Sequence, residues 1–291
     1  MAEGEHINGI WLVRYRNHIL PTMEVWPEGY GWKKWFDEAE TKFKARPDDL
    51  YIASFPKSGH HWSFEFVNML YQGNAHSVNK SKLNNFFELR TIKEIEDMPS
   101  PRILLTHLPY DLMPRDIFEK NCKIIYIMRN PKDVCVSQFH HVSGIAEYKY
   151  DGDWDHFFKV FLKGEVDYGP WFKHVKDWWK LRQEYDHMMY VHYEELKKCL
   201  PAQIKRIAEF INKTHDEQMY LNIANACTFE AMKKNAQFKE LPGIFKTKEG
   251  SFFRKGQVGD WKNTFTVAQN EEFDKAFKRE MEDCDIQFTF D

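Results

Sequence analysis

The sequence predicts an α/β fold, a single domain built on a central parallel sheet flanked by helices. Short apolar runs rich in β-forming residues alternate with segments of helical periodicity, as in a parallel sheet that is covered on both faces. Hydrophobic residues make up 43% of the 291 residues, which is enough for a large core. No internal repeat, low-complexity tract or linker divides the chain, so residues 1–291 are expected to form one domain.

Four short apolar segments are predicted to be the strands of this sheet. They cover residues 50–55, 102–106, 123–128 and 188–192. Apolar residues at helical spacing predict helices at 61–71, 131–141, 170–185, 194–212, 216–225 and 267–283. A turn, Arg46-Pro47-Asp48-Asp49, precedes the first strand, and residues 1–45 are rich in Trp and Tyr without an assigned element.

Composition excludes several classes of protein. The net charge of −3 argues against a general nucleic-acid binder, because such domains usually carry a basic face. Five scattered cysteines without a CxxC pair indicate reduced thiols rather than a disulfide framework. The first residues do not resemble a signal peptide, and no run of 18 apolar residues occurs. We therefore expect a cytoplasmic protein that has neither a membrane nor a nucleic acid as partner.

Polar side chains follow three of the predicted strands. Lys57 comes after the first strand, His107 after the second and Arg129 after the third. Ligands of open parallel sheets bind beyond the carboxyl ends of the strands, where these side chains should meet. This convergence predicts one functional crevice.

The turn at 55–62 has the features of an anion site. It connects a strand to a helix, so unpaired backbone N–H groups lie at the positive end of the helix dipole. Lys57 adds a full charge, but the GxxxxGK[ST] pattern of a Walker A loop is absent. An ordinary strand-to-helix turn explains this segment equally well.

A second basic loop lies near the C-terminus. Arg254 and Lys255 stand beside Gly256, whose backbone freedom would suit the binding of a phosphate monoester, and Arg254 could engage two oxygens at once. A solvated run of charge is the competing interpretation. Two separate basic loops indicate a ligand that carries two separated anionic groups.

These segments together resemble the cytosolic sulfotransferases, along nearly the whole chain. The matches, in order, are ARPDDL at 45–50, FPKSG at 55–59, THLP at 106–109, RNPKDV at 129–134, Trp178-Trp179, HYEEL at 192–196, MKKN at 232–235 and RKGQVGDWKNTFTVAQNE at 254–271. The resemblance implies a P-loop-like nucleotide-binding topology. It also implies an enzyme that moves a sulfonate group from 3′-phosphoadenosine 5′-phosphosulfate to a hydroxyl or amine of a small, aromatic acceptor.

The resemblance assigns roles to individual residues. His107 is implied to be the base that deprotonates the acceptor, Lys57 to stabilise charge on the leaving phosphate, and Ser137 to restrain Lys57. Contacts with the donor are implied for Lys57, Ser58, Gly59, His60, His61, Trp62, Arg129, Ser137, Tyr193, Cys227, Thr228, Phe229, Phe252, Phe253, Arg254, Lys255 and Gly256. Contacts with the acceptor are implied for Phe86, Phe87, His107 and Glu147. No metal is needed, because the donor already carries the sulfonate.

The chain departs from the family pattern at four positions. His60 and His61 stand in place of two threonines, Leu105 in place of a lysine and Cys227 in place of a threonine. Protonated imidazoles at 60 and 61 would bind phosphate more strongly, so we expect donor binding to weaken with rising pH near neutrality. At position 147, a carboxylate facing the acceptor would favour cationic amines, whereas a solvated loop carboxylate would not.

Two further expectations concern assembly and alternatives. Lys262, Thr266, Val267 and Glu271 fit the motif through which relatives dimerise, which predicts a small and weak homodimer interface over 262–271. The main alternative function is a nucleotide-binding module of the same fold with weak or no transferase activity. A P-loop kinase is disfavoured because it would require a Walker A loop and a carboxylate for Mg²⁺.

Overall fold

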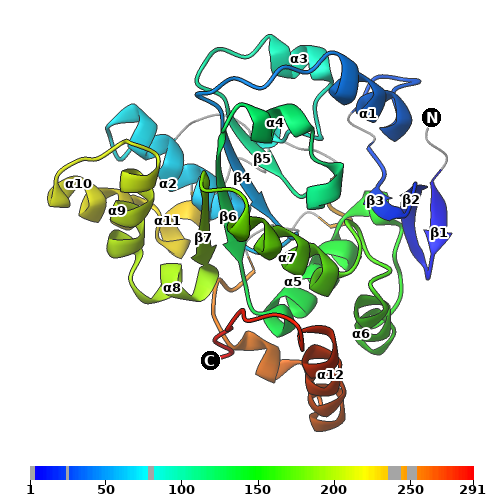
Figure 1. Ribbon diagram of the computed structural model, residues 1–291. Coiled ribbons are helices and arrows are strands. Elements are labelled where there is room, and N and C mark those ends of the chain that lie inside the picture. The colour runs from blue at the N-terminus through cyan, green and yellow to red at the C-terminus, as the bar shows by residue number, and fades with distance from the viewer. Residues whose placement is uncertain (1–3, 24–25, 78–81, 235–243, 248–253) are drawn as a thin grey trace.

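The computed structural model describes residues 4–23, 26–77, 82–234, 244–247 and 254–291. A parallel sheet lies at the centre, in the order β5-β4-β6-β7 (Figure 1). Its strands are β4 (Leu50–Ser54), β5 (Ile103–Thr106), β6 (Lys123–Met128) and β7 (Met188–His192). A separate antiparallel sheet contains β1 (Glu5–Ile7), β2 (Ile10–Tyr15) and β3 (His18–Pro21).

Alternate residues of the central strands enter two different cores. In β4, Leu50 and Ile52 pack with residues of one cluster, while Tyr51 and Ala53 belong to the other. All five residues of this strand are buried. The strands therefore appear in the sequence as continuous apolar runs, which is expected when both faces of a sheet are covered.

Helices cover both faces of the sheet. Those described are α1 (Trp32–Thr41), α2 (His60–Gln72), α3 (Ile92–Glu96), α4 (Arg115–Glu119), α5 (Pro131–Gly144), α6 (Trp154–Lys163), α7 (Trp171–Lys180), α8 (Tyr193–Lys198), α9 (Leu200–Phe210), α10 (Glu217–Ala226), α11 (Phe229–Lys234) and α12 (Val267–Glu280). Figure 1 shows α2 and α8–α10 on one side of the sheet, with α5 and α7 on the other. No helix in the described ranges is long and apolar enough to cross a membrane.

The predicted strands and the parallel sheet are confirmed, and two helix predictions need correction. The helix predicted at 194–212 divides at Cys199, because Pro201 lies in the first turn of α9, where its missing N–H costs nothing. The helix predicted at 170–185 ends at Lys180 and continues as a 3₁₀ turn. The antiparallel sheet formed by residues 5–21 was not predicted.

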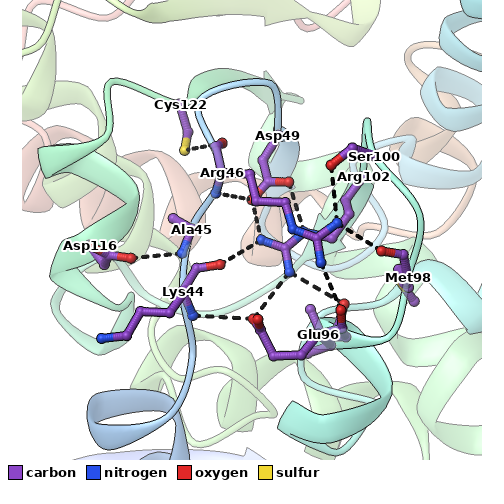
Figure 2. A network of polar contacts seen from close by, with 11 residues as sticks. Lys44, Ala45, Arg46, Asp49, Glu96, Met98, Ser100, Arg102, Asp116 and Cys122 are labelled. Carbon is purple, nitrogen blue, oxygen red and sulfur yellow. Dashed lines mark hydrogen bonds and ion pairs between the residues drawn. The ribbon is translucent and has the colours of Figure 1, made fainter.

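A buried polar network stabilises the end of the sheet where β4 and β5 begin (Figure 2). Arg102 is fully buried and donates to both carboxylate oxygens of Asp49, at 2.7 and 2.5 Å. It also reaches Glu96 at 3.1 Å, and the Lys44 carbonyl accepts from it at 2.7 Å. This network ties together the predicted turn at 46–49 and the start of β5, at the opposite end of the strands from the predicted crevice.

Candidate active site

One cavity of about 270 Å³ lies where the strands end. Lys57, His107 and Arg129 all line it, so the three strand-end side chains do converge. Other predicted site residues on its wall are Gly59, His60, His61, Trp62, Phe86, Ser137, Glu147, Tyr193, Cys227, Phe229, Arg254, Lys255 and Gly256. Residues as far apart in the chain as Lys57 and Gly256 therefore line the same cavity.

The turn between β4 and α2 has an unusual backbone. Lys57 has a φ of 68°, in the left-handed region, which costs a non-glycine residue about 1–2 kcal/mol. Gly59 has a φ of 112°, and a Cβ there would lie 3.0 Å from the Tyr193 ring. Gly59 caps α2 without a side-chain hydrogen bond, so the first backbone N–H groups of this helix remain available to an anion.

Burial makes Lys57 easier to deprotonate. Loss of water and the nearby charges of Arg129 and Arg254 lower the pKa of Lys57 from 10.5 to about 8, although Asp167 opposes the shift. Lys57 therefore remains largely cationic at neutral pH and loses its charge within the mildly alkaline range.

The hydrogen bonds of His107 determine its tautomer. Its Nδ1 lies 2.7 Å from the Ser54 carbonyl, which can only accept, so Nδ1 carries the hydrogen and Nε2 is the basic nitrogen. The backbone N–H of His107 donates to Glu88 at 2.7 Å, and its carbonyl accepts from His174 Nε2 at 3.0 Å. His107 is thus positioned by its backbone as well as by its ring.

The surroundings of His107 keep its ring neutral. Burial, together with His174 and Lys57, lowers the pKa of His107 to about 3, while the Ser54 carbonyl opposes the shift. Burial also raises the pKa of the Glu88 carboxyl to about 7. A neutral imidazole at neutral pH has a lone pair with which to accept a proton.

His60 stacks on His107. The two ring centroids are 4.1 Å apart with an interplanar angle of 18°, and Phe86 contacts both rings. Burial and the neighbouring imidazoles lower the pKa of His60 well below 6.5. The expectation that a protonated His60 would strengthen donor binding near neutrality is therefore wrong for this residue.

Arg129 and the second basic loop, with Arg254 and Lys255, form a group of cations on the cavity wall. Arg129 donates to the carbonyls of Lys57 and Gln257 and lies over the Tyr193 ring, and its buried Nε makes no hydrogen bond with a described residue. Arg254 and Lys255 share the carboxylate of Asp260, at 2.6 and 2.7 Å. Burial raises the pKa of Asp260, but hydrogen bonds from Lys255, Asn263 and Arg254 outweigh it and lower the pKa to about 2.

Buried carboxylates that the sequence analysis missed hold this loop in place. Asp133 accepts hydrogen bonds from the backbone N–H groups of Gly259 and Trp261, at 2.9 and 3.0 Å. Glu194 accepts from both nitrogens of Asn130 at the start of α5. Asp133 lies within the matched segment RNPKDV and Glu194 within the matched segment HYEEL, so both matches were usable signals.

Three aromatic residues form the side of the cavity near α11. Trp62 packs against Tyr193 and donates to the Cys227 carbonyl at 2.8 Å. The ring of Phe229 lies so close to Gly256 that a Cβ on this glycine would approach it to 2.3 Å. Gly256, with a φ of 63°, is therefore the residue that allows the basic loop to approach this ring.

Several predicted contact residues do not line the cavity. Ser58, within the turn between β4 and α2, is buried, and Thr228 is an exposed residue that accepts from Ala231 at the start of α11. Phe87 points into the core, where it packs against Trp35, Phe43 and Tyr51. Phe252 and Phe253 lie outside the described residues.

The other end of the cavity is more apolar and includes residues that the sequence analysis did not consider. Pro21, at the end of β3, reaches this wall together with Thr22 and Met23, and Thr22 donates to Glu147 at 2.9 Å. The further apolar and aromatic residues there are Leu83, Phe86, Leu89, Ile145, Tyr148, Tyr168 and Ile244. In the described part of the chain, no group of three or more His, Cys, Asp or Glu side chains is arranged to hold a metal ion.

Comparison with known proteins identifies the family. The model of the sulfotransferase domain matches residues 47–285. Sulfotransferase 1A1 of Rattus norvegicus is 36% identical over 296 residues, which cover 97% of this chain and 96% of the relative. Sulfotransferase 1E1 of Homo sapiens is 38% identical over 268 residues, covering 88% of this chain and 90% of the relative.

Solved structures agree. Mouse sulfotransferase SULT7A1, crystallised in complex with PAP, superposes with a TM-score of 0.78 at 31% identity and covers 94% of this chain and 96% of its own. Retinol dehydratase gives a TM-score of 0.81 at 22% identity, covers 96% of this chain and 91% of its own, and supports the fold alone. The recognition made from the sequence motifs is confirmed: this chain belongs to the sulfotransferase family.

Proposed function

We propose that this sulfotransferase uses 3′-phosphoadenosine 5′-phosphosulfate as its donor and sulfonates a hydroxyl or amine of a small aromatic acceptor. One observation carries the proposal. A single cavity brings a neutral histidine with a defined basic nitrogen, His107, together with Lys57 and a separate group of cations. This arrangement suits a donor with two anionic groups and an acceptor that must lose a proton.

The residues present fit such a donor. The N-terminus of α2 with Lys57 can hold the 5′ group, while Arg129, Arg254 and Lys255 can hold a 3′-phosphate. The Nε of Arg129, which has no hydrogen-bond partner among the described residues, is a buried donor that an anion would satisfy. The aromatic residues Trp62, Tyr193 and Phe229 supply a surface suited to a purine ring, with Cys227 beside them.

Each residue has a distinct task in the proposed reaction. When bound, the donor supplies the sulfonate and leaves as adenosine 3′,5′-bisphosphate. His107 accepts the acceptor proton at Nε2, a role that is typically worth about 10²–10⁴-fold in rate. Lys57 stabilises the negative charge that develops toward the leaving phosphate, and Ser137, on the same cavity wall, restrains Lys57.

The acceptor, by this proposal, lies between His107 and the apolar wall that contains Phe86, Tyr148 and Tyr168. Phe87 supports this wall from the core, because its ring packs away from the cavity. We further propose that the protein acts in the cytoplasm as one domain over residues 1–291.

A weak homodimer through residues 262–271 is also proposed. Val267, in the middle of the segment, is 78% exposed, which is unusual for a large apolar side chain in this structure. Lys262, at the start of the segment, pairs with Asp291 at the C-terminus. A short segment with one exposed apolar anchor is consistent with a small interface.

The test is transfer of labelled sulfonate to a panel of phenols, alcohols, steroids and amines. Wild type should label at least one acceptor, and His107→Ala should lose transfer by about 10²–10⁴-fold while keeping its affinity for adenosine 3′,5′-bisphosphate. Tight binding of the bisphosphate without transfer to any acceptor would favour the alternative, a nucleotide-binding module. The presence of both His107 and Lys57 in the cavity argues against that alternative.

A further inference from the structure

The main chain of His107 is held by a residue that does not line the cavity. The His107 carbonyl accepts from Nε2 of His174 at 3.0 Å, and no other described residue donates to this carbonyl. His174 lies on α7 and is buried, and it is not among the residues of the cavity wall. The proposed reaction gives it no task.

The hydrogen bonds of His174 define which ring nitrogen carries its hydrogen. A carbonyl can only accept, so Nε2 carries the hydrogen. Nδ1 is then bare, and it accepts from the Tyr126 hydroxyl at 2.9 Å. Tyr126 belongs to β6, and burial raises the pKa of its hydroxyl far above the ordinary value, so the hydroxyl keeps its hydrogen. Two successive hydrogen bonds therefore connect β6, through α7, to the backbone of His107.

The ring of His174 is fixed and neutral. It stacks on the Tyr126 ring at a centroid distance of 6.0 Å and contacts the Phe55 ring edge-on at 5.4 Å. Burial lowers the pKa of His174 to about 4, although the hydrogen bond to the His107 carbonyl and the charge of Asp177 oppose the shift. At neutral pH the ring thus has one donor and one acceptor, and both are used.

Helix α7 holds two successive carbonyls of the segment that follows β5. One turn after His174, the indole N–H of Trp178 donates to the Leu108 carbonyl at 3.2 Å. Residues four apart lie on the same face of a helix, so one face of α7 supplies both donors. Two hydrogen bonds from one helix restrict both the translation and the rotation of the backbone at 107–108.

Proton transfer requires this restriction, because it depends on a short distance. Nε2 of His107 must lie within about 2.6–3.2 Å of the oxygen or nitrogen that it deprotonates. The Ser54 carbonyl fixes only the other ring nitrogen, Nδ1. A misplacement of about 1 Å can cost about 10²-fold in rate. A donor that fixes the backbone of His107 should therefore affect the rate of transfer and not the affinity for the nucleotide.

We propose that His174 is a positioning residue for the transfer reaction. Its Nε2–H holds the His107 carbonyl, and the Tyr126 hydroxyl holds the His174 ring in the orientation that this hydrogen bond requires. The inference rests on the proposed function, in which His107 is the base. His174 acts through His107 and touches neither the donor nor the acceptor.

Three variants separate the hydrogen bond from the packing. His174→Phe keeps an aromatic ring beside Tyr126 and Phe55 but removes the donor, so kcat should fall by about 10- to 100-fold. His174→Gln places an amide N–H near the position of Nε2 and should restore most of the lost kcat. Tyr126→Phe removes one neutral hydrogen bond and should lower kcat by about 2- to 10-fold. The acceptor KM and the affinity for adenosine 3′,5′-bisphosphate should change by less than about twofold in all three.

Two hydrogen bonds of the same kind elsewhere in the fold provide matched controls. Nε2 of His215 lies 2.9 Å from the Leu70 carbonyl in α2, and the Tyr185 hydroxyl donates to the Cys122 carbonyl just before β6. His215→Phe and Tyr185→Phe remove the same chemical groups and should leave kcat unchanged. An equal loss of kcat in these controls would indicate a general effect on packing and would overturn the proposal.

Nuclear magnetic resonance of protein with ¹⁵N-labelled histidine gives a readout that packing alone would not change. In wild type the ring hydrogen should lie on Nε2 of His174 and on Nδ1 of His107. His107 should become a mixture of both tautomers in His174→Phe and should keep its single tautomer in His174→Gln.

The results that would overturn the proposal are specific. They are a hydrogen on Nδ1 of His174 in wild type, an unchanged kcat in His174→Phe, and a His174→Gln variant that folds but stays as slow as His174→Phe. Absence of transfer by wild type to every acceptor would instead refute the proposed function, and the ring signals would still test whether His174 holds His107.

Discussion

The lowered pKa of Lys57 predicts that nucleotide binding weakens as pH rises above about 8. Burial, Arg129 and Arg254 disfavour the ammonium form, and a bound anion favours it. Affinity should therefore be complete below the pKa of the free protein and should decline above it. Binding also weakens with rising pH in the expectation based on His60 and His61, but the titrating group and the pH range are different.

The size of the effect follows from the titration. If only the protonated lysine binds the anion, the dissociation constant scales with 1 + 10^(pH − pKa), and raising the pH from 7 to 9 weakens binding about tenfold for a pKa of about 8. A lysine with the ordinary pKa of 10.5 would change the constant by only about 3%. A phosphate monoester has its second pKa near about 6, so the ligand contributes little in this range.

Calorimetric titration with adenosine 3′,5′-bisphosphate between pH 7 and 9 measures this effect. Lys57→Arg is the matched control, because a guanidinium stays charged and its binding should be independent of pH. The control is needed because burial also lowers the pKa of Lys197, which lines the same cavity. Constant wild-type affinity, or a decline that persists in Lys57→Arg, would refute the reasoning.

Three further predictions concern stability, nucleotide binding and assembly. Asp49→Asn leaves the guanidinium of Arg102 buried without its main partner and should cost about 3–5 kcal/mol of unfolding free energy in urea denaturation. Gly256→Ala forces a methyl group to within 2.3 Å of the Phe229 ring and should weaken bisphosphate binding at least about tenfold, or about 1.4 kcal/mol. Val267→Glu places a charge at the proposed contact and should shift sedimentation at micromolar concentration toward the monomer.

Each of these three predictions has a control variant or an outcome that would contradict it. Asp37→Asn breaks an exposed pair with Lys33 and should leave the denaturation midpoint nearly unchanged, so an equal loss in both variants would contradict the argument from burial. Gly29→Ala also places a Cβ at positive φ, but in open space, and should not affect nucleotide binding. A purely monomeric wild type would exclude the proposed interface.

Sequence patterns were sufficient where a feature depends on local chemistry. The four strands could be predicted because both faces of the sheet are buried, which makes each strand a continuous apolar run. The convergence of Lys57, His107 and Arg129 followed from a topological rule about strand ends. Pro201 shows the limit of this approach, since its effect on one helical pattern was not anticipated.

The fold class, the family and the strand-end residues were thus determined by the sequence itself, because they depend on local periodicity and on segments that can be matched in order. Tertiary structure alone decided the rest. Only folding brings Pro21–Met23 and Asp167 to the cavity, stacks His60 on His107 and turns Phe87 into the core. It also sets the pKa values of Lys57 and His107, since loss of water and the proximity of other charges exist only once distant segments have packed together.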